Sequence, residues 1–129
     1  MGLDMYAYRI KGNLSSEKKP CINPQPEEFF YWRKNRHLNN VMKNIFIRKY
    51  GRNEEFNCRL LNLDSNDLDY IENLIRSDRI EEYDAPGLFF GDNNYDEEAY
   101  ERDLVFIRLA REVLASGDKV YYYCSWSQY

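Results

Sequence analysis

The stretch GLFFGDNNYDEEAYERDLVFIRLAREVLASGDKVYYYCSW, residues 87–126, decides the predicted fold. It opens with a short apolar run between two glycines, residues 87–91, which suits a buried strand and is too short for a helix. Residues 92–94 supply the Asp and Asn side chains of a turn. Asn94 is then placed to cap a helix, and Glu97 can bond back to it.

The same stretch continues with one long amphipathic helix and a closing strand. The core-facing stripe of the helix recurs at three- and four-residue steps, at Leu104, Ile107, Ala110 and Leu114. Gly117 is placed to end this helix in a left-handed conformation. Residues 119–126 are β-branched and aromatic without a breaker and predict a strand. Its alternation turns one set of side chains inward, Val120, Tyr122, Cys124 and Trp126, and the other outward, Tyr121, Tyr123 and Ser125.

The first half of the chain predicts a strand, a loop and a cationic helix. Residues 5–10 form the strand, with Tyr6, Tyr8 and Ile10 on one face. Residues 12–26 form a loop, because Gly, Ser, Lys and Pro leave nothing periodic to pack. Pro26 opens the helix and Gly51 ends it. The apolar side of this helix comprises Tyr31, Leu38, Met42, Ile45 and Phe46.

The middle of the chain predicts one more strand and one more helix. Residues 56–63 form the strand, and Asp64 or Ser65 caps the short helix that follows. Its apolar side comprises Leu68, Ile71, Leu74 and Ile75. We therefore predict a single α+β domain over residues 1–129, with a small, mostly antiparallel sheet of three to five short, tyrosine-rich strands. Three helices cover one face of the sheet, and the terminal strands pair centrally or side by side.

Composition excludes several classes of function. The net charge of −4, from 22 acidic and 18 basic residues, argues against binding to nucleic acid or to an anionic membrane. Cys21, Cys58 and Cys124 have no paired spacing, so free thiols in a reducing compartment are expected. No secretory leader and no long apolar span is found, which predicts a cytoplasmic protein without a membrane partner. The 12 tyrosines suit half-buried sheets and interfaces.

The sequence offers no catalytic, metal or cofactor motif. Neither a GxxxxGK[ST] loop nor a GxGxxG loop is present. The single histidine, His37, is surrounded by cations, and no Cys or His pair has the spacing of a zinc chelate. We therefore predict no catalytic residues, no metal ligands and no cofactor. The candidate ligand- or partner-binding residues are Asp4, Tyr6, Trp32, Arg33, Lys34, Asp96, Tyr123 and Trp126.

Five short motifs resemble those of a family of small phage and prophage proteins. They are GLDMY at residues 2–6, YWRK at 31–34, FFG at 89–91, YDE at 95–97 and SW at 125–126. Members of that family begin MGLDMYL and carry similar motifs in the same order over nearly the whole chain. The resemblance implies a phage origin, the host cytoplasm and no established activity. Some members carry a phosphoglycerate kinase label, which the length of this chain and its missing nucleotide loop do not support.

Two functional hypotheses follow. In the first, the protein is a non-enzymatic phage or mobile-element accessory protein that binds a host protein, with inhibition of host defence as one form; a homodimer stays open. In the second, it is a small enzyme or a nucleotide- or small-ligand-binding protein. Its pocket would be lined by Asp4, Tyr6, Trp32, Arg33, Asp96 and Trp126. There Asp4 or Asp96 would be the acid/base and Arg33 would hold an anion.

The two tryptophans are predicted to matter most for folding or binding. Trp126 ends the inward set of the last strand, so Trp126→Ala should leave little folded protein. Lys43→Glu should melt nearly like the wild type, because the cationic side of its helix is predicted to face solvent. Trp32 is left open between the core and the site.

Overall fold

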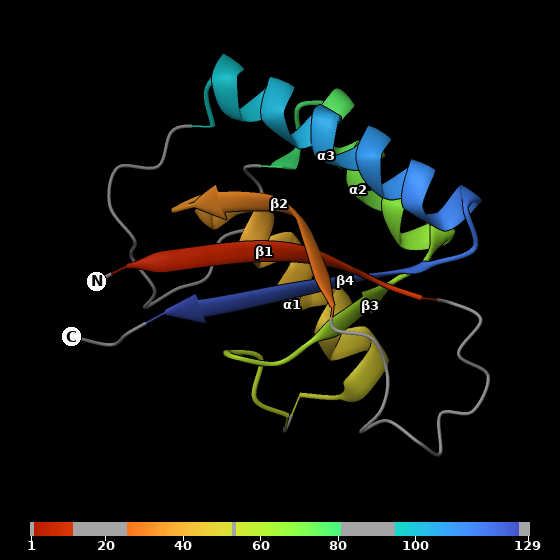
Figure 1. The fold of residues 1–129 in the computed structure, drawn as a ribbon. Coiled ribbons are helices and arrows are strands. Elements are labelled where there is room, and N and C mark those ends of the chain that lie inside the picture. Colours follow the sequence, from red (N-terminus) through yellow and green to blue (C-terminus); the bar gives the residue numbers. More distant parts are fainter. Residues whose placement is uncertain (1, 12–25, 53, 81–94, 127–129) are drawn as a thin grey trace.

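A four-stranded antiparallel sheet carries three helices on one of its faces (Figure 1). The computed structural model describes residues 2–11, 26–52, 54–80 and 95–126. In chain order the elements are β1 (Leu3–Ile10), β2 (Glu27–Arg33), α1 (Arg36–Tyr50), β3 (Leu61–Leu63), α2 (Ser65–Arg76), α3 (Glu97–Ala115) and β4 (Lys119–Trp126). This confirms the predicted α+β class.

The first and last strands lie side by side in the middle of the sheet, as predicted. The strand order is β2-β1-β4-β3, and every neighbouring pair is antiparallel. β1 and β4 pair over their full length, from Leu3 opposite Trp126 to Ile10 opposite Lys119. The two ends of the described chain therefore form the central ladder of the fold.

Alternation along the strands separates a buried face from an open one. Leu3, Met5 and Ala7 of β1 and the matching residues of β4, Val120, Tyr122 and Cys124, are fully buried under the helices. The Tyr122 hydroxyl donates to Asn39 Oδ1 of α1 at 2.5 Å, which satisfies a polar group at the centre of the core. The inward set predicted for the last strand is confirmed, except that Trp126 is only partly buried.

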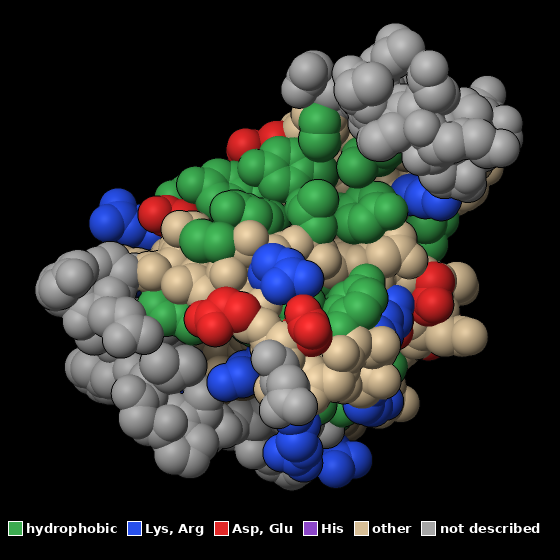
Figure 2. All heavy atoms as spheres, turned by 90° about the horizontal axis from the view of Figure 1, so that it is seen from below, with side chains coloured by type: hydrophobic (Ala, Val, Ile, Leu, Met, Phe, Trp, Pro, Cys, Tyr) green, Lys and Arg blue, Asp and Glu red, His purple; other side chains and the backbone are tan. Residues whose placement is uncertain are grey.

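The opposite face of the sheet carries tyrosines and no described helix. It presents Tyr6, Tyr8, Tyr31, Tyr121 and Tyr123. Tyr6 contacts three other rings on this face, with centroids 5.3 to 6.1 Å apart. Figure 2 shows hydrophobic side chains, tyrosine included, gathered in one band, with charged side chains mainly outside it. We call this surface the open face.

The predicted first helix is wrong over its first ten residues. Glu27–Arg33 is a strand, and the helix begins only at Arg36, where the Asn35 side chain accepts from the Leu38 amide at 3.1 Å. The aromatic run within 29–32 packs better on a sheet than on a helix, because alternate rings reach the core. Tyr31 therefore belongs to β2 and not to the helical stripe. Gly51 ends the helix as predicted.

The two other helices are present as predicted, except that the N-cap of α3 lies two residues later than expected. Asp64 caps α2 in a capping box with Asp67. α3 is capped by Asp96, whose carboxylate accepts from the Ala99 amide at 2.9 Å, and not by Asn94. An aspartate is the stronger cap here, because its charge also complements the positive end of the helix. The predicted strand at 87–91 and turn at 92–94 lie outside the described residues, as does nearly all of the predicted loop.

The strand predicted at residues 56–63 is shorter in the structure, at Leu61–Leu63. Residues 57–58 form a turn instead, and Cys58 has a positive φ of 66°. The Asn57 side chain replaces a strand at this edge: it donates to the Trp126 carbonyl at 3.1 Å and accepts from the Trp126 amide at 3.0 Å. A side-chain amide can stand in for a backbone partner, which no strand propensity indicates.

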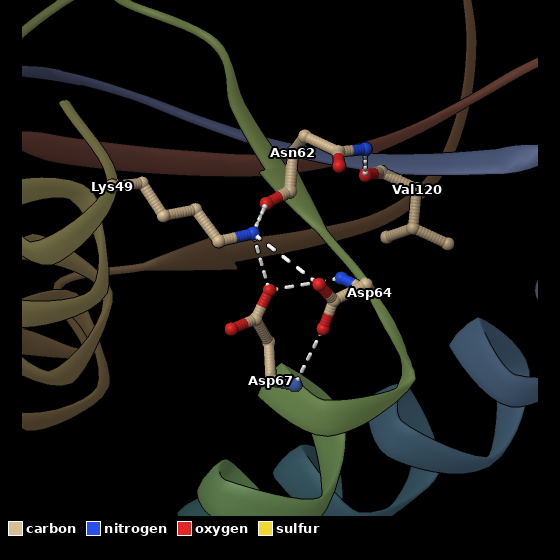
Figure 3. A network of polar contacts seen from close by, with 5 residues as sticks. All are labelled: Lys49, Asn62, Asp64, Asp67 and Val120. Carbon is tan, nitrogen blue, oxygen red and sulfur yellow. Dashed lines mark hydrogen bonds and ion pairs between the residues drawn. The ribbon is translucent and has the colours of Figure 1, made fainter.

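On each outer strand of the sheet, one basic side chain from a helix bonds a backbone carbonyl. At β3, Lys49 Nζ donates to the Asn62 carbonyl at 2.6 Å and pairs with the Asp67 carboxylate at 2.5 Å (Figure 3). At β2, the Arg102 guanidinium donates to the Tyr31 carbonyl. Each bond occupies a backbone acceptor that an added strand would use.

Candidate ligand-binding pocket

A cavity of about 220 Å³ lies where the end of β2, the start of α1 and the start of α3 meet. Four cations line it, namely Arg33, Lys34, Arg36 and Arg102, together with two carboxylates, Asp96 and Glu98. Trp32, Asn35, His37, Tyr95 and Ala99 complete the wall.

The cationic side of the pocket is built by the turn between β2 and α1. Lys34 adopts a positive φ of 63°, which reverses the chain so that Asn35 can cap the helix. The first turn of α1 contains no acidic residue, and Arg36 and His37 occupy it instead. Cations at the positive end of a helix are electrostatically unfavourable, so an anion bound there would relieve the repulsion.

The floor of the pocket is a polar network around one buried carboxylate. Asp103 of α3 is fully buried, and the Trp32 indole nitrogen donates to it at 2.9 Å. The Asn35 amide donates to it at 3.1 Å and the Tyr95 hydroxyl at 2.5 Å. These contacts tie the strand, the cap of α1 and the chain before α3 to one carboxyl group, so the shape of the pocket depends on it.

Burial raises the pKa of Asp103 to about 6, although the hydrogen bonds from Tyr95, Trp32 and Asn35 and the charge of Arg102 act in the opposite direction. Burial and the nearby Asp103 charge raise the pKa of Tyr95 far above its ordinary value. Tyr95 is therefore a permanent hydrogen-bond donor. Asp103 titrates close to neutral pH.

Arg102 connects the pocket to the sheet edge. Its guanidinium lies 4.8 Å from the centroid of the Phe30 ring, which holds the cation in place beside the cavity. The same group donates to the Tyr31 carbonyl. A cation held in this way loses little further conformational entropy when it meets a ligand.

The structure brings four of the sequence-predicted site residues together at the pocket: Trp32, Arg33, Lys34 and Asp96. Asp4, Tyr6 and Tyr123 lie on the open face instead, where Asp4 stands opposite Arg33 in the register. Trp126 lies near Phe56, with ring centroids 6.2 Å apart, and does not line the pocket. Trp32 is only 3% exposed, so it is a core residue whose edge forms part of the wall.

The central group, Asp103, and its partners Asn35 and Tyr95 are not among the candidate residues predicted from the sequence. One signal was present: Asp103 lies one helical turn before Phe106 and Ile107, on the inward stripe of its helix. A carboxylate at a core-facing position needs hydrogen-bond donors from other buried side chains. Such a residue in the sequence therefore indicates a buried polar network.

Within the described ranges, no group of three His, Cys, Asp or Glu side chains could hold a metal ion. Among the same residues, no helix is long and apolar enough to cross a membrane. Comparisons with protein-family models, with curated proteins and with solved structures give no match to this chain. The resemblance to the phage family therefore stays a prediction.

Proposed function

We propose that this protein binds a small anionic ligand, through a phosphate or carboxylate group, in the pocket between β2, α1 and α3. The observation that carries the proposal is the lining of the cavity, where four cationic side chains face two carboxylates. Arginine and lysine are the side chains that proteins use to hold phosphate and carboxylate groups.

The charge pairing of the protein supports this proposal. Several cations elsewhere have acidic partners, such as Arg9 with Asp118 at 2.6 Å and Arg111 with Glu72 at 2.8 Å, although Lys43 has none among the described residues. Within the described part of the chain, Arg33 and Lys34 have no ion pair, and both are exposed. Lysine in the left-handed region is strained by about 1–2 kcal/mol, where glycine would not be. A lysine at this position is consistent with a function for its side chain.

The geometry supports binding rather than catalysis. Asp103, whose pKa is raised to about 6, is fully buried and already accepts bonds from three side chains. A general base must reach the proton that it removes, directly or through one water. We therefore assign Asp103 a positioning role, in which it holds the pocket walls.

Titration calorimetry with inorganic phosphate and pyrophosphate, at low and fixed ionic strength, tests the proposal. We expect saturable binding that Arg33→Gln combined with Lys34→Gln weakens at least about tenfold, since each charged hydrogen bond contributes about 1.5–3 kcal/mol. Lys119→Gln with Lys43→Gln removes the same charge far from the pocket and should leave the affinity unchanged. Equal losses in both double variants would indicate non-specific attraction and would contradict the proposal.

The open face supports a second candidate function, the binding to a host protein that the sequence predicts. Its contacting tyrosine rings are the side-chain type enriched at the centres of protein interfaces. Capture from host lysate by the wild type but not by Tyr8→Ala with Tyr123→Ala would support it. Equal capture by the two proteins would contradict it.

A further inference from the structure

The cavity is too small to enclose a whole cofactor-sized ligand. Pockets that enclose drug-sized ligands usually measure about 300–1,000 Å³, and this cavity measures about 220 Å³. It has room for a phosphate or a similarly compact group. The remainder of a larger ligand would therefore lie outside the cavity, on the surface next to its rim.

The surface beside Arg33 is an exposed aromatic ring. Tyr31 and Arg33 alternate onto the same face of β2, so their Cα atoms are about 7 Å apart along the strand. Tyr31 is 38% exposed. The cation and the ring are therefore neighbours on this face of the strand.

The Tyr31 ring is held in a fixed orientation. Its hydroxyl donates to Asp4 Oδ1 at 2.5 Å, and its ring lies 5.3 Å from that of Tyr6. An aromatic side chain that is already ordered loses little entropy when a second ring stacks on it. Trp32, in contrast, is buried against Phe106 and cannot offer a face to a ligand.

We propose that the ligand is a phosphorylated molecule with a planar ring, of the nucleotide class, whose phosphate lies in the cavity at Arg33 and Lys34 and whose ring stacks on Tyr31. This inference rests on the proposed anion site and adds the ring to it. A sugar is the kind of spacer that joins a phosphate to a base in such molecules. The hydrogen bond from Trp32 to Asp103 fixes the position of β2 at the pocket. Because Trp32 lies between Tyr31 and Arg33, this bond also fixes the ring and the anion site relative to each other.

The test compares three probes on the full chain by calorimetry: adenosine monophosphate, ribose 5-phosphate and inorganic phosphate. Base–aromatic stacking predicts that the nucleotide binds roughly 5- to 150-fold more tightly than ribose 5-phosphate. Equal affinity of the two would overturn the ring assignment and leave the anion site intact. Absence of binding by all three would overturn both proposals.

Two matched variants locate the ring. Tyr31→Leu keeps an apolar side chain at an exposed position but removes the aromatic face. It should reduce nucleotide affinity to that of ribose 5-phosphate and leave phosphate binding unchanged. Tyr121→Leu makes the same change on β4 of the open face and should change neither affinity. If Tyr31→Leu binds the nucleotide as tightly as the wild type, the ring does not stack there and the inference fails. Circular dichroism is the control that checks whether both variants are folded.

Discussion

The indole nitrogen of Trp32 donates a hydrogen bond at 2.9 Å to the carboxylate of Asp103, a residue 71 positions later in the chain. This bond joins an outer strand of the sheet to the longest helix, and it lies directly under the pocket. The same buried contact therefore belongs to the fold and to the candidate site. A substitution at this contact should change both stability and binding, whereas one at the rim of the pocket should change binding alone.

Removing the Asp103 carboxylate should destabilise the fold strongly. Asp103→Ala leaves the buried Trp32 indole without its acceptor and removes the bonds from the partly buried Asn35 amide and Tyr95 hydroxyl. A buried group without a partner costs about 1–3 kcal/mol and each partly buried bond contributes about 0.5–1.5 kcal/mol, so we expect a loss of at least about 2 kcal/mol in urea denaturation. Asp69→Asn, at an exposed ion pair with Arg111, is the control and should stay within about 0.5 kcal/mol. Similar losses in the two variants would mean that the buried network contributes little.

Stability should depend on pH through Asp103. Its pKa rises from 3.8 to about 6 on folding, so the folded state binds the proton more tightly than the unfolded state. The contribution of Asp103 is therefore greatest below about pH 4 and falls as pH rises to about 6, by up to about 3 kcal/mol. Glu72 and Asp64, whose pKa values are lowered, act in the opposite direction, because their stabilisation is lost as pH falls.

Asp103→Asn isolates this contribution. The advantage of the wild type over this variant in free energy of unfolding should shrink between pH 4 and pH 7. In an NMR titration, the Trp32 indole proton should shift with a midpoint near pH 6 in the wild type only, with the Trp126 indole as the reference. A Trp32 midpoint near pH 4 would show that Asp103 has an ordinary pKa.

The two tryptophans should differ, and Trp126 should contribute less to stability than the sequence predicted. Trp32 is 3% exposed and contacts Phe106 and Tyr122, whereas Trp126 is only partly buried. Trp32→Ala should lose about 3–5 kcal/mol and Trp126→Ala about 2 kcal/mol, measured by thermal and urea unfolding. A larger loss of unfolding free energy for Trp126→Ala than for Trp32→Ala would contradict this assignment of Trp32 to the core.

Lys34→Gly should separate stability from binding. Glycine adopts the positive φ of 63° without strain, and this gain offsets the added freedom of the unfolded chain. The free energy of unfolding should therefore stay the same or rise by up to about 1.5 kcal/mol, while phosphate affinity falls about fivefold or more. Unchanged affinity in this folded variant would remove Lys34 from the site.

Lys49→Met should weaken the edge of the sheet. The change removes the donor to the Asn62 carbonyl and the ion pair with Asp67, both of which join α1 to β3 and α2. We expect a loss of about 1–2 kcal/mol. Lys43→Met, on the same helix and without an ion pair in the described residues, should lose less. Equal melting temperatures for the two variants would show that the Lys49 contacts are not stabilising.

The sequence predicted the elements whose signals are local and periodic. The last strand, the long helix before it and the short helix capped at Asp64 all follow from alternation, apolar spacing and capping side chains. The failure at residues 26–35 has a physical cause. Proline followed by two glutamates is a good helix start, but aromatic packing on the sheet is stronger than that local preference.

The site was less predictable, because its parts meet only through tertiary contacts. The YWRK motif contributed Trp32, Arg33 and Lys34 to the lining of the pocket. The opposite wall of the pocket comes from the start of α3, more than sixty residues later in the chain. No spacing rule places Asp103 beneath Trp32; that follows only from the crossing of α3 over β2.

The central claim is that the pocket binds an anion, and a ¹H–¹⁵N NMR titration of the full chain with pyrophosphate tests it most directly. We predict saturable shifts concentrated in the backbone amides of residues 34–38 and 96–99 and in the Arg33 and Arg102 side chains, with little change around Lys43 and Lys119. Shifts that do not saturate, or that spread evenly over all lysines and arginines, would contradict the claim.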